Sequence, residues 1–163
     1  MKPLQNGMNA PDFSLKSPEG VMVNLKTALT QGPAVIIMLP DINHRDTADI
    51  VDNFRDDYNE FTALRANLIP IIRAEDDALV KLKQEHELQF SLFGDPGATV
   101  FKKYGALDGL IFKKPKKYGC VVDRSGTITR AFRSVDANKF SRQALYALRD
   151  QMGRSALRSK DGK

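Results

Sequence analysis

The sequence is poor in cysteine and in histidine, with Cys120 as the one cysteine among 163 residues and with two histidines. A single cysteine excludes a disulfide within one chain and a zinc site built from several cysteines. His44 and His86 do not form a spacing motif for metal ligation. We therefore predict no metal site and no cofactor, and the low cysteine content fits a reducing compartment.

Long apolar runs are also missing. The longest, residues 34–39, is far shorter than the ~20 residues of a membrane-spanning helix and lies between Pro33 and Pro40. Residues 1–7 carry one positive charge with no apolar segment behind it, which is unlike a secretory signal. These features predict a cytoplasmic protein that does not contact a membrane.

The chain shows no repeat, low-complexity tract or break in composition. A length of 163 residues suits one domain with its own hydrophobic core. We expect that domain to cover residues 1–152. Residues 153–163 are polar and basic with little to bury, and this predicts a flexible tail.

The net charge of +5 is unevenly distributed. Residues 46–60 contain six acidic side chains against Arg55, whereas residues 102–117 contain six lysines against Asp108. Such patches can steer self-association or the approach of an anionic partner. The simpler interpretation, two solvated faces, is the one that we favour.

Strand and helix patterns alternate along the chain. Residues 34–39 have the continuous apolar character of a strand buried on both faces, and residues 67–72 are expected to form a second buried strand. Apolar residues three and four apart after Asp46 predict the longest helix, which the side chain of Asp46 or Thr47 can cap. The remaining elements expected are a strand at 21–25, a helix through 79–86, a short strand at 89–93, a short helix at 98–104, strands at 118–122 and 127–132 joined by a turn, and a helix at 136–152. This order predicts an α/β fold with a mixed sheet covered by helices on both faces.

Several short motifs occur in one order along most of the chain. They are the segment 7–15, the turn 17–20 with the strand after it, the strand before Pro40, Phe54, Asp95 with Pro96, residues 103–105, and 121–123 before Ser125 and Gly126. Together they resemble the peroxiredoxins of the alkyl hydroperoxide reductase and thiol-specific antioxidant (AhpC/TSA) family. The resemblance covers residues 7 to about 150, and it implies a thioredoxin-like fold, thiol-dependent peroxide reduction and a homodimer formed near the active-site loop.

The catalytic loop of that family has the form Pro-x-x-x-Thr-x-x-Cys, followed later by an arginine six residues before an aspartate. Pro40 matches the proline of this loop. The resemblance places His44 at the threonine, Thr47 at the cysteine and Lys117 at the arginine. Three of the four catalytic positions are therefore changed.

These changes remove the sulfur chemistry. A cysteine thiolate attacks a peroxide oxygen and becomes a sulfenic acid, whereas a threonine oxygen has no such oxidation state to enter. Lys117 offers one compact charge in place of an arginine fork. His44 can serve as a base toward Thr47, although we favour a solvated or capping histidine. We expect a chain without the peroxidase activity, acting as a binding or assembly module.

Two alternatives remain open. Cys120 is either a small apolar filler in an interior strand, which we favour, or the centre of a residual oxidoreductase if its thiol reaches solvent. A lysine run between Phe112 and Tyr118 forms either a solvated loop or a site for a polyanion. The lysines of this run are Lys113, Lys114, Lys116 and Lys117.

Overall fold

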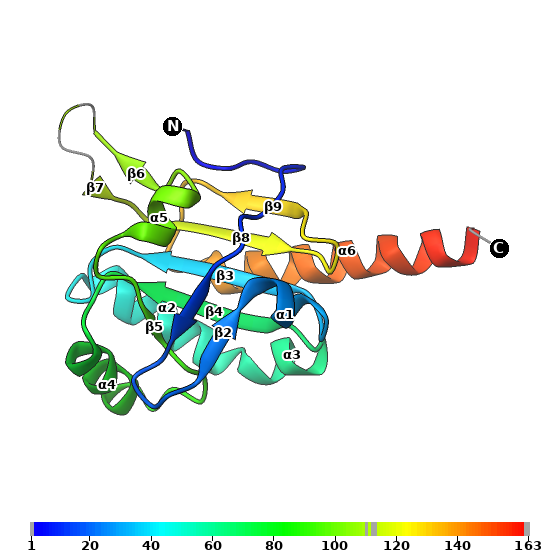
Figure 1. Cartoon of the computed structure of the whole chain (residues 1–163). Helices are drawn as coiled ribbons and strands as arrows, with labels where there is room; N and C mark the ends of the chain where they lie inside the picture. The colour runs from blue at the N-terminus through cyan, green and yellow to red at the C-terminus, as the bar shows by residue number, and fades with distance from the viewer. Residues whose placement is uncertain (1, 110, 112–113, 162–163) are drawn as a thin grey trace.

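A five-stranded mixed sheet forms the centre of the chain, in the strand order β5-β4-β3-β8-β9 (Figure 1). The structure is a computed structural model, and it describes residues 2–109, 111 and 114–161. The strands are β3 (Ala34–Leu39), β4 (Asn67–Ile72), β5 (Phe93–Gly94), β8 (Tyr118–Val122) and β9 (Ile128–Phe132). β3, β4 and β5 run parallel, and β8 runs antiparallel to both of its neighbours. The sheet is therefore mixed, as predicted.

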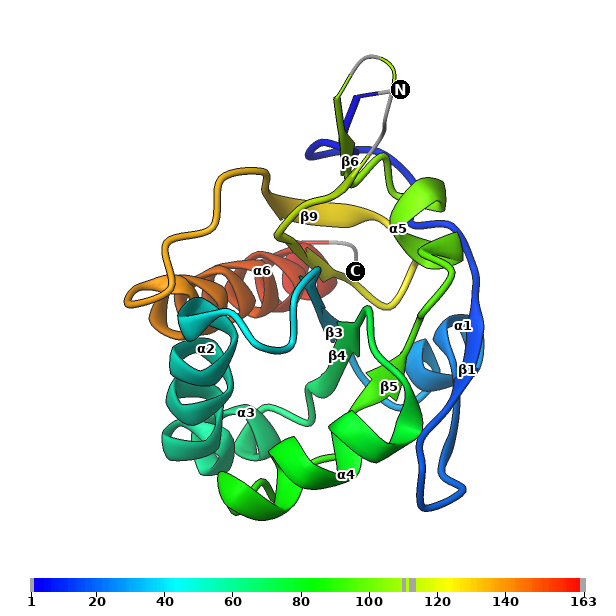
Figure 2. The same ribbon diagram turned by 90° about the vertical axis from the view of Figure 1, so that its left-hand side faces the viewer.

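Helices cover both faces of this sheet (Figure 2). One face packs against α2 (Arg45–Asp56), α3 (Tyr58–Ala63), α4 (Asp76–Glu85) and α6 (Phe140–Asp161). The other face packs against α1 (Leu25–Leu29) and α5 (Thr99–Lys103). Two hairpins lie outside the sheet, β1 (Ser14–Lys16) with β2 (Met22–Asn24), and β6 (Leu107–Asp108) with β7 (Lys114–Pro115). The predicted α/β class is confirmed, and the architecture is thioredoxin-like.

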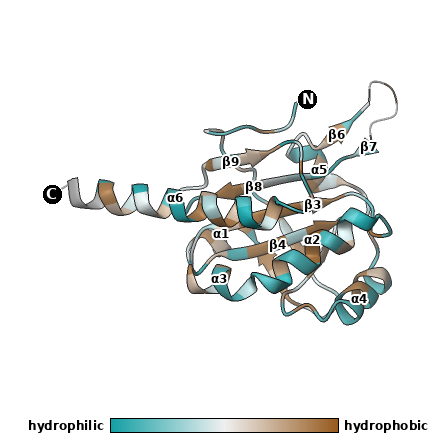
Figure 3. Cartoon of the chain, turned by 180° about the vertical axis from the view of Figure 1, so that it is seen from behind, coloured by the Kyte–Doolittle hydropathy of each residue, from teal (hydrophilic) through white to brown (hydrophobic). Residues whose placement is uncertain are grey.

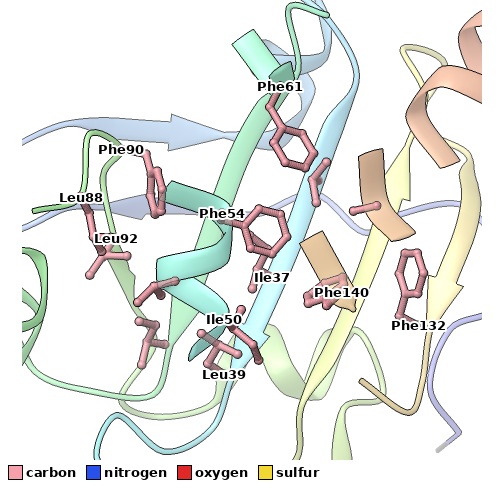
Figure 4. Packing of buried hydrophobic residues seen from close by; sticks show 14 of the residues in the cluster. Ile37, Leu39, Ile50, Phe54, Phe61, Leu88, Phe90, Leu92, Phe132 and Phe140 are labelled. Atoms are coloured by element: carbon pink, nitrogen blue, oxygen red, sulfur yellow. The ribbon is translucent and has the colours of Figure 1, made fainter. Parts of the chain in front are cut away.

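The central strand β3 divides the core in two. Its side chains alternate, so Val35, Ile37 and Leu39 join the cluster under α2 and α6, while the intervening residues join the cluster under α1 and α5. The first cluster contains packed aromatic rings, and the centroid of Phe54 lies 5.3 Å from that of Phe140 (Figure 4). Both faces of the strand are apolar because both are covered.

The long helix predicted after Asp46 is in fact two helices. α2 ends at Asp56 and α3 begins at Tyr58. At the break, Asp57 accepts a hydrogen bond from the Ser141 hydroxyl at 2.7 Å, a tertiary contact that helical periodicity does not contain. The predicted cap was also wrong, because the residue that caps α2 is His44.

The strand predicted at 89–93 is shorter and later than expected. Only Phe93 and Gly94 pair with β4, at Ile71 and Ile72. Pro70 precedes these partners on β4 and has no N–H to donate to a ladder, so pairing starts after it.

The carboxyl-terminal helix differs most from the sequence interpretation. α6 begins at Phe140 and continues to Asp161, extending beyond the sheet, so residues 153–161 of the expected tail are helical (Figures 1 and 3). Good helix formers such as Leu157 follow Gly153, and Arg154 pairs with Asp150 one turn earlier at 3.3 Å. Burial against the core is therefore not the only interaction that stabilises α6. Within residues 2–109, 111 and 114–161, no helix is both long and apolar enough to cross a membrane.

Arginines of α6 neutralise part of the acidic segment 46–60. Arg142 on α6 lies 3.4 Å from Asp57 and also pairs with Glu60 at 2.5 Å. Arg149 lies 3.3 Å from the same Glu60. Part of the charge separation seen in the sequence is thus neutralised where α6 packs beside α2 and α3.

Candidate functional site

The loop after β3 carries the first candidate residues. Pro40 follows the last residue of the strand, and the chain turns through Asp41 into α2. Thr47 lies in the first turn of this helix and is 2% exposed. Its hydroxyl donates to the backbone carbonyl of Asp41 at 2.5 Å. The hydroxyl proton of Thr47 therefore fastens the loop to the helix.

His44 caps α2. Its Nδ1 accepts the backbone N–H of Asp46 at 3.0 Å, which satisfies one of the unpaired donors at the start of the helix. This nitrogen is thus engaged, and the Thr47 proton points to a carbonyl rather than to an imidazole. The geometry supports a capping histidine and does not pair His44 with Thr47 as base and nucleophile.

Lys117 reaches the same corner from the start of β8, which pairs with β3 through Tyr118 and Met38. Its Nζ forms an ion pair with the carboxylate of Asp46, next to Thr47 in the sequence. The hydrogen bond and positive charge of Lys117 hold the pKa of Asp46 below its usual value. The structure thus brings together Pro40, His44, Thr47 and Lys117, with Asp46 as a member that the sequence analysis missed.

This ion pair predicts a pH-dependent stability. Because the pKa of Asp46 is lower in the folded chain, the pair stabilises the fold above the unfolded value of about 3.9 and stops doing so as the pH falls through the folded value. Lys117→Met is therefore expected to lower the free energy of unfolding at pH 7. The difference from the natural chain should become smaller as the pH falls below about 3.9.

Urea denaturation at pH 7, 5 and 3 measures the effect. Lys116→Met is the matched control, since Lys116 forms no ion pair among the residues that the structure describes. A deficit of Lys117→Met that stays constant over this pH range would contradict the assignment.

Cys120 lies in the middle of β8, paired with Ile36 of β3 and Ala131 of β9. It is fully buried, and burial raises the pKa of its thiol to about 12. A buried neutral thiol is a poor nucleophile because the thiolate is the reactive form. The position agrees with the interpretation as an apolar filler.

The lysine run is divided by the fold. Lys117 is paired with Asp46, Lys116 is half-buried, and Lys114 is exposed on β7. Lys113 lies outside the residues that the structure describes. The three lysines that the structure describes therefore do not form one uniform patch.

A groove of about 860 Å³ lies beside the loop, and the sequence analysis missed it. It is lined by the turn at Pro40–Asn43, by Arg73 after β4, by Lys102 of α5 and by Lys114 of β7. The position of Arg73 directly after a buried strand was a signal that the sequence offered. Within the described ranges, the groove included, no group of three or more His, Cys, Asp or Glu side chains is arranged to hold a metal ion.

Comparison with known proteins agrees with this fold. The model of the AhpC/TSA family matches residues 7–131. The chain is similar to the chloroplastic peroxiredoxin Q of Suaeda salsa, 27% identical over 125 residues, which cover 77% of this chain and 58% of that relative. It is also similar to peroxiredoxin Bcp of Bacillus subtilis, 24% identical over 157 residues, which cover 90% of this chain and 96% of the relative.

A solved structure shares the architecture. The crystal structure of peroxidoxin BcpB from Mycobacterium tuberculosis superposes with a TM-score of 0.82 at 24% identity, covering 90% of this chain and 97% of that one. At this identity the likeness shows the fold. The chain spans 58% of the length of the Suaeda salsa relative, so the matched region is only part of that protein.

Proposed function

The chain belongs to the AhpC/TSA family of peroxiredoxins, and from that premise we propose that it has kept the family's fold without its thiol peroxidase activity. The observation that carries the proposal is Thr47 in the first turn of α2, with its hydroxyl bound to the carbonyl of Asp41. This is the position at which the family resemblance places the peroxide-reducing cysteine.

The chemistry of peroxide reduction supports the proposal. A thiolate attacks one peroxide oxygen, the O–O bond breaks, an alcohol leaves, and the sulfur becomes a sulfenic acid. One thiol condenses with this acid to a disulfide and releases water, and a second thiol reduces the disulfide. A threonine oxygen cannot give up two electrons to the peroxide in this way. Lys117, which pairs with Asp46, also cannot supply the paired hydrogen bonds of an arginine.

Cys120 does not offer a substitute. Its side chain is fully buried in the central sheet, and a hydroperoxide would have to open β8 to reach it. The raised pKa of the thiol further lowers its thiolate fraction. Redox chemistry at this residue therefore has no support from the geometry.

A direct assay tests the loss of activity. The natural chain, incubated with hydrogen peroxide and dithiothreitol, is expected to consume peroxide at the rate of dithiothreitol alone. Cys120→Ala should behave identically, and mass spectrometry should find Cys120 unmodified in the folded protein. Turnover above the dithiothreitol rate by the natural chain would overturn the proposal.

The remaining role is that of a binding or assembly module, which we place in the cytoplasm. We propose a homodimer formed beside the active-site loop, where the exposed side of α2 retains acidic residues such as Asp49. Light scattering should give a mass near twice 18.2 kDa at high concentration, and this mass should fall toward 18.2 kDa on dilution. A mass of one chain at every concentration would exclude the dimer.

A further inference from the structure

The groove beside the former active-site loop is a concave surface at one edge of the sheet. It lies beyond the carboxyl ends of the parallel strands β3 and β4, where open α/β sheets commonly bind ligands. Its volume of about 860 Å³ falls within the usual range for small-molecule sites. Of the four positions matched to the family's catalytic residues, only Pro40 lines the groove. The groove is therefore separate from His44, Thr47 and Lys117.

Three cations line this groove from three different elements. They are Arg73 after β4, Lys102 on α5 and Lys114 on β7. None of these side chains has a hydrogen bond or an ion pair within the part of the chain that the structure describes. The neighbouring Lys103 and Lys117, in contrast, are engaged by the Asp12 carbonyl and the Asp46 carboxylate.

Few carboxylates oppose these charges. Asp41 lines the groove, and its Oδ1 already accepts the backbone N–H of Asn43 at 2.9 Å. Asp108 stands opposite Lys114 in the β6–β7 ladder, with its Oδ1 bound to the N–H of Gly109 at 3.0 Å. Positive charge therefore predominates in the hollow, and concave walls focus such a field on a small anion.

The backbone holds Arg73 in place. Its N–H donates to the carbonyl of Leu39 at 3.1 Å, which fixes the origin of the side chain next to the end of β3. An arginine fork can bind two oxygens of a phosphate or a carboxylate at once, and lysines add point charges around it. The three groups fit a compact anion with several negative charges better than a long chain of single charges.

We propose that this groove binds a small multivalent anion carrying phosphate or carboxylate groups, through Arg73, Lys102 and Lys114. The inference names a ligand class for the proposed binding role and rests on that role. This proposal and the proposed loss of peroxidase activity can fail independently, because a chain without peroxidase activity can still lack an anion site.

Isothermal titration with pyrophosphate, and separately with citrate, tests the site in the full-length chain. We expect saturable binding of at least one probe that weakens as salt is raised. The variant Arg73→Gln, Lys102→Gln, Lys114→Gln should bind at least ~10-fold more weakly, the loss that about 1.4 kcal/mol produces. The preferred probe tells a phosphate ligand from a carboxylate one.

The matched control removes three exposed lysines elsewhere, by Lys16→Gln, Lys26→Gln and Lys139→Gln. It lowers the net charge equally and should retain the affinity of the natural chain. Equal losses in both variants would show a general charge effect and overturn the proposal, as would no binding of either probe. An oligonucleotide that binds and is not displaced by pyrophosphate would indicate a polyanion surface and would also overturn it.

Discussion

Thr47→Cys, made in a Cys120→Ala background, is expected to consume hydrogen peroxide in the presence of dithiothreitol at least ~10-fold faster than the reductant alone. The new sulfur would stand in the first turn of α2, where the positive end of the helix favours a thiolate. Its attack on peroxide forms the S–O bond and breaks the O–O bond. Dithiothreitol then returns the sulfenic acid to the thiol with loss of water.

Thr47→Ser in the same background is the matched control. Serine keeps the hydroxyl that donates to the Asp41 carbonyl, so its fold should be unchanged and its peroxide consumption should equal that of the reductant. Trapping with a sulfenic-acid reagent and mass spectrometry identifies the oxidised residue in Thr47→Cys. A folded but inert Thr47→Cys would mean that this position is not where the reactive atom belongs.

The activity of Thr47→Cys also depends on Lys117. This lysine is bound to Asp46, so it contributes one charge near residue 47 and no fork of donors. The gain should therefore remain well below the rate of a complete peroxiredoxin site. Such a partial gain would distinguish the effect of the missing sulfur on the rate from the effect of the altered residues around it.

The two long parallel strands could be predicted because they carry their own signal. β3 is apolar throughout and β4 is apolar after Asn67, which strands covered on both faces require. The hairpin of β8 and β9 was predicted from the residues of its turn. Gly126 supplies the positive φ of 92° that this turn needs.

The errors lie where tertiary contacts override local pattern. The break at Asp57 depends on Ser141, which is far away in the sequence. The cap of α2 was assigned to Asp46 or Thr47, whereas both are occupied elsewhere, by Lys117 and by the Asp41 carbonyl. The position of Arg73 was the one signal of the groove in the sequence, because Arg73, Lys102 and Lys114 meet only once β4, α5 and β7 are placed.

Phe140→Ala is expected to cost about 3–5 kcal/mol of the free energy of unfolding, a large share of the ~5–15 kcal/mol typical of a domain. Phe140 is the first residue of α6 and is 1% exposed. Its ring lies 5.3 Å from that of Phe54 and 5.3 Å from that of Phe132, and it joins α6 to both α2 and the sheet (Figure 4). Urea denaturation measures the loss, and Tyr146→Ala on the same helix, 71% exposed, should stay within about 0.5 kcal/mol of the natural chain.

A second substitution shows whether the ring itself causes this effect. A Cβ added at Gly119 on β8 would lie 2.1 Å from Cζ of Phe140, so Gly119→Ala alone should cost about 1–3 kcal/mol by overpacking. In the Phe140→Ala background the three atoms nearest the added methyl group are gone, since all three belong to that ring. Gly119→Ala should then cost much less, and the two substitutions should be less harmful together than the sum of each alone. Strictly additive losses would mean that Phe140 does not occupy the space above Gly119, and the packing of α6 on the sheet would have to be revised.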